Sequence, residues 1–249
     1  MKIEKLKKLK NGKYKLELDN GESITTYDDI IIKNMLFNGK SLDNQILSEI
    51  SINNNYYDVY YKIVKMISTK WRSEKEVTEY MTKNEVSSKL QDRVIKELKK
   101  NDLLNDKRFA KSYANDAISL RKNGPYKIAD DLKKLGISDS IIEETLNNLD
   151  EEEINSNLVN IIIKKNKLNK TNSLYQLKNK LANELIRLGY DASLVHTKLN
   201  ELLKEDKSIY QKEYDRLYKK YSKKYSGNEL KYKVKQALYQ KGFNYIDEW

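Results

Sequence analysis

The sequence contains no cysteine, one proline, one histidine and eight glycines among its 249 residues. The lack of cysteine excludes disulfides, thiolate zinc sites and cysteine nucleophiles, and it fits a reducing compartment. His196 is the only histidine, so a metal site built from several histidines is also excluded. We therefore expect a cytoplasmic protein that carries no metal or cofactor.

Long apolar runs are also missing. No stretch approaches the roughly 20 apolar residues that a membrane span requires, and the N-terminus lacks the apolar segment of a signal peptide. Charged residues make up 34% of the chain, and the mean hydropathy is −0.83. Such values are shared by disordered chains. Nineteen tyrosines and the scarcity of proline and glycine nevertheless favour a folded, helical protein without membrane contact.

Basic residues exceed acidic ones by 48 to 37, which gives a net charge of +11. A positive balance suggests nucleic acid or an acidic surface as a partner. Genomic bias can account for some of the lysine excess, because Lys, Asn, Ile and Tyr all have A/T-rich codons. The six arginines against 42 lysines argue against dense bidentate recognition of phosphate or guanine. Any contact with nucleic acid is therefore expected to be weak, sequence-independent and salt-sensitive.

The first fifty residues form a unit of their own. Alternating apolar residues between two Asn-Gly dipeptides predict a three-stranded meander over about 2–10, 13–19 and 22–27. Asp28 or Asp29 then caps a short helix that ends near Gly39, where a helix typically stops.

From residue 54 onward, helical periodicity is overlaid by a longer repeat. Three glycines, each with a leucine four residues before it and a large apolar residue after it, are 53 residues apart: Gly136, Gly189 and Gly242, the last followed by Phe243. Asn84 lies 52 residues before Gly136 and can also adopt the left-handed conformation of a residue after a helix. The period predicts a tandem array of three-helix units, in which the glycine separates the second helix from the third.

Local signals agree with this division. Ser73 and Glu76 form the pattern of a capping box, and Gly124-Pro125 interrupts the chain between two helices. The resulting domains are an N-terminal β-rich extension at 1–50, three-helix repeats at 51–104, 105–150 and 151–204, and a truncated helical repeat at 205–249. Their net charges are +1, +3, 0, +3 and +4 in that order.

The last repeat carries the clearest basic face. Tyrosines recur at helical spacing on one side of residues 210–225, and we favour core packing over base stacking as their role. The opposite side is either an ordinary solvated face or a surface for phosphates or an acidic protein. Its residues are Lys212, Arg216, Lys219, Lys220, Lys223 and Lys224.

Most of the chain resembles the RecX family of bacterial recombination regulators, most sharply over residues 70–150 and 180–246. The likeness rests on an Asn-Asp helix cap, a Phe-Ala pair, the Leu-x-x-x-Gly-apolar turn and an Arg-Ser that opens a helix in the first repeat. We expect the residues that carry it to act mainly in structure: Arg72, Ser73, Asp106, Phe109, Ala110, Tyr113, Gly136, Gly189, Gly242 and Phe243.

Three features depart from the family pattern. Asn84-Glu85 replaces the usual glycine and apolar residue, a long linker from Lys164 to Asn172 precedes a helix, and the last repeat lacks a full final helix.

The resemblance implies an elongated, curved helical array that acts as a regulator in DNA repair, homologous recombination and the SOS response. Family members bind the RecA recombinase in the groove of its filament on DNA and suppress ATP hydrolysis and strand exchange. The implied protein is a monomer that also contacts single- or double-stranded DNA. The alternatives are a sequence-independent DNA-binding helical repeat protein without a recombinase partner and a structural scaffold.

No pattern in the sequence is typical of an enzyme. His196 has no neighbouring ligand type and is interpreted as a packing or surface residue. Asp106 is interpreted as the cap of the helix that follows it rather than as a functional carboxylate. We therefore expect no enzymatic activity.

Overall fold

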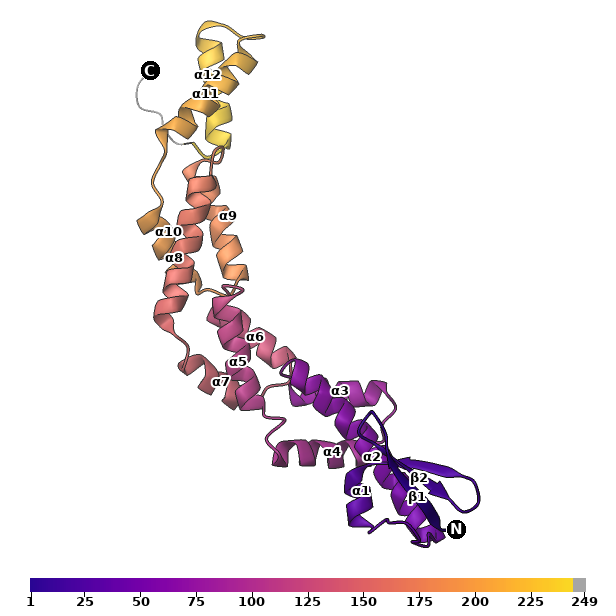
Figure 1. Ribbon diagram of the computed structural model, residues 1–249. Helices are drawn as coiled ribbons and strands as arrows, with labels where there is room; N and C mark the ends of the chain where they lie inside the picture. Colours follow the sequence, from indigo (N-terminus) through magenta and orange to yellow (C-terminus); the bar gives the residue numbers. More distant parts are fainter. Residues whose placement is uncertain (244–249) are drawn as a thin grey trace. The chain divides into compact units, whose positions relative to one another are not determined.

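The computed structural model describes residues 1–243, which form two compact units, residues 1–109 and the residues from Ala110 onward (Figure 1). The fold is mostly helical and begins with a small antiparallel sheet, as predicted. The strands are β1 (Ile3–Lys8), β2 (Tyr14–Leu18) and β3 (Ser23–Thr26). The helices are α1 (Asp28–Lys33), α2 (Asn44–Thr69), α3 (Glu74–Lys83), α4 (Ser88–Lys100), α5 (Asp106–Ser119), α6 (Pro125–Lys134), α7 (Asp139–Asn147), α8 (Glu151–Leu168), α9 (Leu174–Arg187), α10 (Ala192–Leu202), α11 (Lys207–Tyr221) and α12 (Gly227–Gln240).

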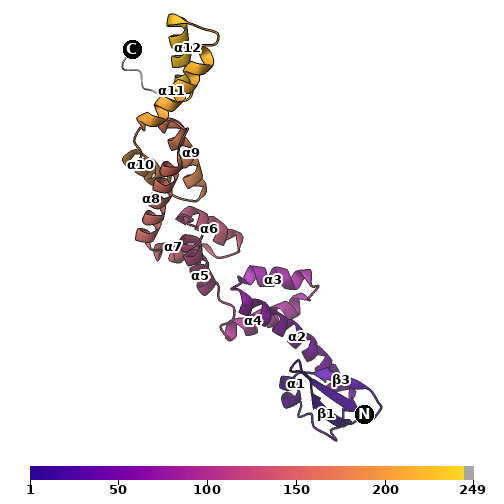
Figure 2. The ribbon, with the colours of Figure 1, turned by 45° about the horizontal axis from the view of Figure 1, so that its top comes forward.

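The sheet is a meander in the order β1-β2-β3, which confirms the predicted topology. Gly12 and Gly21 adopt positive φ in the turns between strands, as the Asn-Gly dipeptides require. Leu16 and Leu18 on β2 are buried in a core that also contains Ile30 of α1 and Ile50 of α2. Figure 2 shows the sheet beside these helices. The strands therefore obtain a buried face by packing on α1 and α2.

Helix α1 is shorter than the sequence suggested. Its N-cap is Tyr27, so Asp28 and Asp29 are residues of the first turn rather than caps. The helix ends at Lys33, before Gly39, because Met35 turns to positive φ.

Helix α2 runs through the expected boundary between residues 50 and 51, and Asp43 caps it by accepting from the Ile46 amide. Side chains of the sheet region reach this helix: the Lys13 ammonium and the Tyr27 hydroxyl each lie 2.6 Å from Asp58 Oδ1, and the Thr26 hydroxyl donates to Asn54. The first residues and α2 are thus one packed body.

The helices of the second unit follow the predicted order, although the division of the chain into repeats stays a prediction. Helix α8 continues to Leu168, so the linker before α9 is much shorter than the stretch from Lys164 to Asn172 that we expected. The last residues of the fourth predicted repeat, 244–249, lie outside the described residues. In the described part of the chain, no helix is long and apolar enough to cross a membrane.

Candidate partner-binding surfaces

The predicted basic face is divided between a helix and a turn. Lys212, Arg216, Lys219 and Lys220 lie on α11, but that helix ends at Tyr221. Lys223 and Lys224 therefore lie in the turn that leads to α12, so the prediction of one continuous helical face is wrong for them. All six side chains are exposed.

The tyrosines of this region are core residues, with one exception. Tyr210, Tyr214, Tyr221 and Tyr225 pack partly buried against a core that includes Leu217. Burial raises the pKa of Tyr210 and of Tyr214. Tyr218, at 44% exposure, is the member of the stripe that faces solvent.

Arg216 is engaged within the protein. Its guanidinium donates two hydrogen bonds to Glu213, from Nε at 2.9 Å and from Nη2 at 2.7 Å. The Lys241 ammonium lies 2.7 Å from the same carboxylate. The hydrogen bond from Arg216 and the contact with Lys241 lower the pKa of Glu213 to about 2. Arg216 is therefore a poorer candidate for phosphate contact than its lysine neighbours.

The lysines of the basic face differ from Arg216 in their contacts within the protein. Among residues 1–243, no carboxylate lies within ion-pair distance of Lys212, Lys219, Lys223 or Lys224. Lys220 lies over the ring of Tyr221, 5.4 Å from its centroid. These ammonium groups can contact an anionic partner without breaking an internal ion pair.

The residues at the start of α3 are structural, and the capping box is confirmed. The Ser73 hydroxyl accepts from the Glu76 amide, and the Glu76 carboxylate accepts from the Ser73 amide at 3.0 Å. The same carboxylate accepts from Arg72 Nη1 at 2.9 Å. Ser73 is fully buried, so this arrangement satisfies polar groups that water cannot reach.

Asp106 does not cap the helix that follows it. Asn105 does so, because its side-chain oxygen accepts from the Lys107 and Arg108 amides. Asp106 Oδ1 instead accepts from the Glu74 amide at 2.9 Å and so caps α3, 32 residues earlier. Burial, together with the nearby Glu74 carboxylate, raises the pKa of Asp106.

The Phe-Ala pair and the tyrosine after it have separate roles. Phe109 and Ala110 are buried. The Tyr113 hydroxyl donates to Asp131 at 3.0 Å, and the Arg121 guanidinium lies over its ring. The Tyr113 hydrogen bond holds α5 against α6.

The predicted turns end the second helices in one common geometry. Gly136, Gly189 and Gly242 have positive φ, and the amide after each bonds to the carbonyl five residues earlier; the last of these amides belongs to buried Phe243. In the first repeat, Glu85 rather than Asn84 has positive φ, and Val86 makes the equivalent bond to Met81. The alignment through Asn84 is therefore one residue off.

Gly124 and Gly189 make a contact that the sequence patterns did not indicate. The Gly124 amide donates to the Leu188 carbonyl at 2.7 Å, and the Tyr126 amide donates to the Gly189 carbonyl at 3.0 Å. A Cβ on Gly124 would lie 2.3 Å from that carbonyl oxygen. Gly124 lies 65 residues before Gly189, and the sequence gives no reason to pair them. A glycine followed by proline is already explained by the break between two helices.

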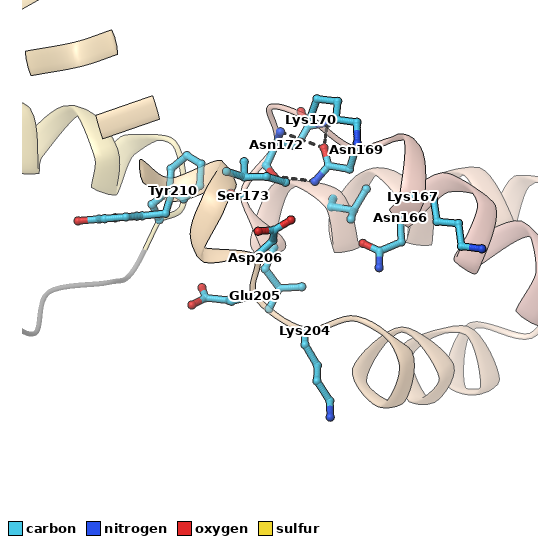
Figure 3. Close-up of a pocket in the computed structure, with 14 residues that line it drawn as sticks. Asn166, Lys167, Asn169, Lys170, Asn172, Ser173, Lys204, Glu205, Asp206 and Tyr210 are labelled. Atoms are coloured by element: carbon cyan, nitrogen blue, oxygen red, sulfur yellow. Dashed lines mark hydrogen bonds between the residues drawn. The ribbon is translucent and has the colours of Figure 1, made fainter. Parts of the chain in front are cut away.

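A similar junction joins α9 to the end of α12. The Ser173 hydroxyl donates to the Lys241 carbonyl at 2.7 Å, and the Cβ position of Gly242 lies 2.9 Å from the Tyr175 ring. Beside it is a pocket of about 220 Å³ between the segments before α9 and before α11 (Figure 3). Asn169 and Asn172 bond to each other at one side, and Asp206 faces them from the other.

This pocket offers amides, lysines and carboxylates but no arrangement of a nucleophile with a base. In the residues that the structure describes, no group of three His, Cys, Asp or Glu side chains could hold a metal ion. His196 is exposed on α10. The surfaces with the clearest capacity for binding are therefore helical faces.

Comparisons with known proteins agree on one family. A family model described as RecX, second three-helix domain, matches residues 105–146. Regulatory protein RecX of Streptococcus agalactiae serotype Ia is 34% identical over 260 residues, covering 99% of this chain and 96% of that protein. Regulatory protein RecX of Streptococcus gordonii is 33% identical over 255 residues, with the same coverage.

Two solved structures have a similar fold. One is described as the crystal structure of regulatory protein RecX and has a TM-score of 0.64 at 21% identity, covering 78% of this chain and 96% of that chain. The crystal structure of RecX from Lactobacillus salivarius has a TM-score of 0.55 at 25% identity, covering 60% and 97%.

Proposed function

The chain belongs to the RecX family of regulatory proteins, and from this premise we propose that it regulates the RecA recombinase, mainly as an inhibitor. It binds in the groove of the RecA–DNA filament and suppresses ATP hydrolysis and strand exchange. The observation that carries the proposal is the 34% identity to a regulatory protein RecX over 99% of the chain.

The same proposal includes the cellular location, the oligomeric state and the pathways in which the protein acts. The protein acts in the cytoplasm as a monomer, in DNA repair, homologous recombination and the SOS response, and it acts by binding rather than by catalysis. Lys212, Lys219, Lys223 and Lys224, exposed and without an ion pair among residues 1–243, support electrostatic attachment to an acidic filament or to DNA.

The experiment follows ATP hydrolysis by RecA on single-stranded DNA at saturating ATP while the protein is added. We expect strong inhibition at amounts well below one copy per RecA monomer, because each bound copy affects a stretch of filament. An unchanged hydrolysis rate would exclude filament regulation.

The second candidate is a sequence-independent DNA-binding protein without a recombinase partner, which the exposed lysines also favour. It predicts inhibition only when enough protein is present to coat all of the DNA. A titration repeated at the same RecA concentration and twice the DNA concentration separates the two. The protein concentration that gives half-maximal inhibition should rise with the DNA for the general binder and should stay unchanged for the regulator.

A further inference from the structure

Large apolar side chains are exposed on α6, α9 and α12, the second helices of the predicted repeats beyond Ala110. Tyr175 and Ile186 on α9 are eleven residues apart, which is about three helical turns, and Tyr232 and Tyr239 on α12 are seven apart, about two turns. Each pair therefore shares a helix face. Together with Tyr126 at the start of α6, their exposures are 65% for Tyr126, 61% for Tyr175, 42% for Ile186, 62% for Tyr232 and 65% for Tyr239.

The helices that carry these side chains meet end to end at the glycine turns. The Gly189 carbonyl accepts from the Tyr126 amide, and the Gly189 amide donates to the Ile186 carbonyl, so the end of α9 adjoins the start of α6. Gly242 lies beside Tyr175, whose ring would be 2.9 Å from a Cβ on Gly242, and the Gly242 amide donates to the Tyr239 carbonyl. Figures 1 and 2 both place α9 between α6 and α12. We call the four exposed tyrosines, taken together with Ile186, the aromatic row.

The helices that carry the aromatic row are all basic. Helix α6 has three lysines and two aspartates, and α9 has three basic residues and one glutamate. Helix α12 has three lysines and one glutamate, Glu229 in its first turn, and its exposed Lys235 lies between Tyr232 and Tyr239. By contrast, α7 has three acidic and no basic residues, and α10 is neutral. Positive charge and exposed rings thus coincide on α9 and α12, whereas the three lysines of α6 form ion pairs with aspartates.

We propose that the aromatic row binds single-stranded nucleic acid, with tyrosine rings stacked on unpaired bases and the neighbouring lysines in contact with phosphates. Exposed rings interleaved with cations suit this ligand, because every base offers a π-face and the strand supplies the opposite charge. A duplex hides its base faces, so it gains only the phosphate contacts. The inference rests on the DNA contact that the proposed function includes and assigns it to residues.

The test measures binding of the full chain to a fluorescein-labelled 20-nucleotide oligo(dT) by anisotropy, with a duplex of equal length in parallel. The double variant Tyr232→Ala/Tyr239→Ala lacks both rings. It should bind oligo(dT) about tenfold or more weakly than the wild type, while its affinity for the duplex changes less than twofold. The double change to Phe should retain the wild-type affinity, because the ring is kept. Tyr218→Ala removes an exposed tyrosine outside the row and should have no effect. Circular dichroism melting confirms that each variant is folded.

The outcomes also separate this inference from the proposed function. Weaker oligo(dT) binding with RecA inhibition retained or reduced supports the aromatic row as a single-strand site. Unchanged oligo(dT) affinity, no measurable affinity of the wild type, or an equal loss for Tyr218→Ala overturns it. If inhibition of RecA falls while oligo(dT) binding is unchanged, the row is a protein-contact surface, and the inference fails while the proposed function stands.

Discussion

Gly124 and Gly189 approach each other so closely that neither position has room for a side chain. A Cβ on Gly189 would lie 2.2 Å from the Lys127 backbone nitrogen, and one on Gly124 would lie 2.3 Å from the Gly189 oxygen. The absence of side chains allows the segment at Gly124 to donate two backbone hydrogen bonds directly to the turn at Gly189. Gly189 therefore ends α9 and also docks that turn on α6.

Gly189→Ala should lower the free energy of unfolding by about 3 kcal/mol or more. The positive φ of 88° costs about 1 to 2 kcal/mol for alanine, and the clash with the Lys127 backbone adds to this. Gly227→Ala is the matched control, because Gly227 has positive φ but nothing within 4 Å of its Cβ position. It should lose only about 1 kcal/mol in urea denaturation followed by circular dichroism. Equal losses for the two variants would contradict a docking role.

Asp106 illustrates what residue patterns conceal. The sequence places it at the start of a helix, where an acidic residue is expected to cap that helix locally. In the structure its partner is the Glu74 amide, which is distant in sequence and adjacent only after folding. The local capping box at Ser73 could be predicted, since both of its partners lie within three residues.

At the level of elements, Glu213 holds α11 to the end of α12. It accepts from Arg216 on its own helix and from Lys241, the C-cap of the next one. Its side chain is only 12% exposed, so both contacts are partly shielded from solvent. This carboxylate therefore stabilises the pair of helices that carries the basic face.

Stability of this helix pair should decrease in acid because of Glu213. Its pKa is about 2 in the folded protein and near 4.5 in an unfolded chain, so the unfolded chain binds the proton first as the pH falls. The stabilisation is complete above pH 4.5 and is lost between pH 4.5 and 2. Glu213→Gln removes the ionisable group, so the free energy of unfolding of this variant should fall less in acid than that of the wild type, by about 1 to 2 kcal/mol after allowing for solvent screening. Urea titrations at pH 7 and pH 3 measure it, and an identical pH slope in both proteins would refute the assignment.

Helix existence was easier to predict than helix ends. The glycine period located the three turns that end second helices, because a positive-φ residue with an apolar follower leaves a local signal. The ends of α8 and α11 were missed, since lysine and asparagine are compatible with helix, turn and linker alike. The aromatic row was also missed, because its members come from three helices that meet only through the junctions.

For the whole molecule, the position of charge is more informative than its amount. The net charge of +11 could reflect codon usage, and basic residues such as Arg72, Lys127 and Arg93 pair with acidic neighbours or cover tyrosine rings. Lys212, Lys219, Lys223 and Lys224 have no such carboxylate partner among residues 1–243. If these lysines bind a partner, reversing their charge should weaken binding more than the same charge reversal at lysines elsewhere on the surface.

Changing Lys219, Lys220, Lys223 and Lys224 to Glu should weaken binding to the RecA filament and flatten its dependence on salt. Each contacted phosphate contributes a slope of about −0.7 to −0.9 in a plot of log affinity against log salt, so loss of two to four contacts reduces the magnitude of the slope by about 1.4 to 3.6. The control changes Lys2, Lys5, Lys7 and Lys10, which are exposed in the sheet region, to Glu. Both variants have a net charge of +3, because each substitution removes two of the original +11. If the two variants show equal slopes, binding senses only the total charge, and α11 with its turn is an ordinary solvated surface.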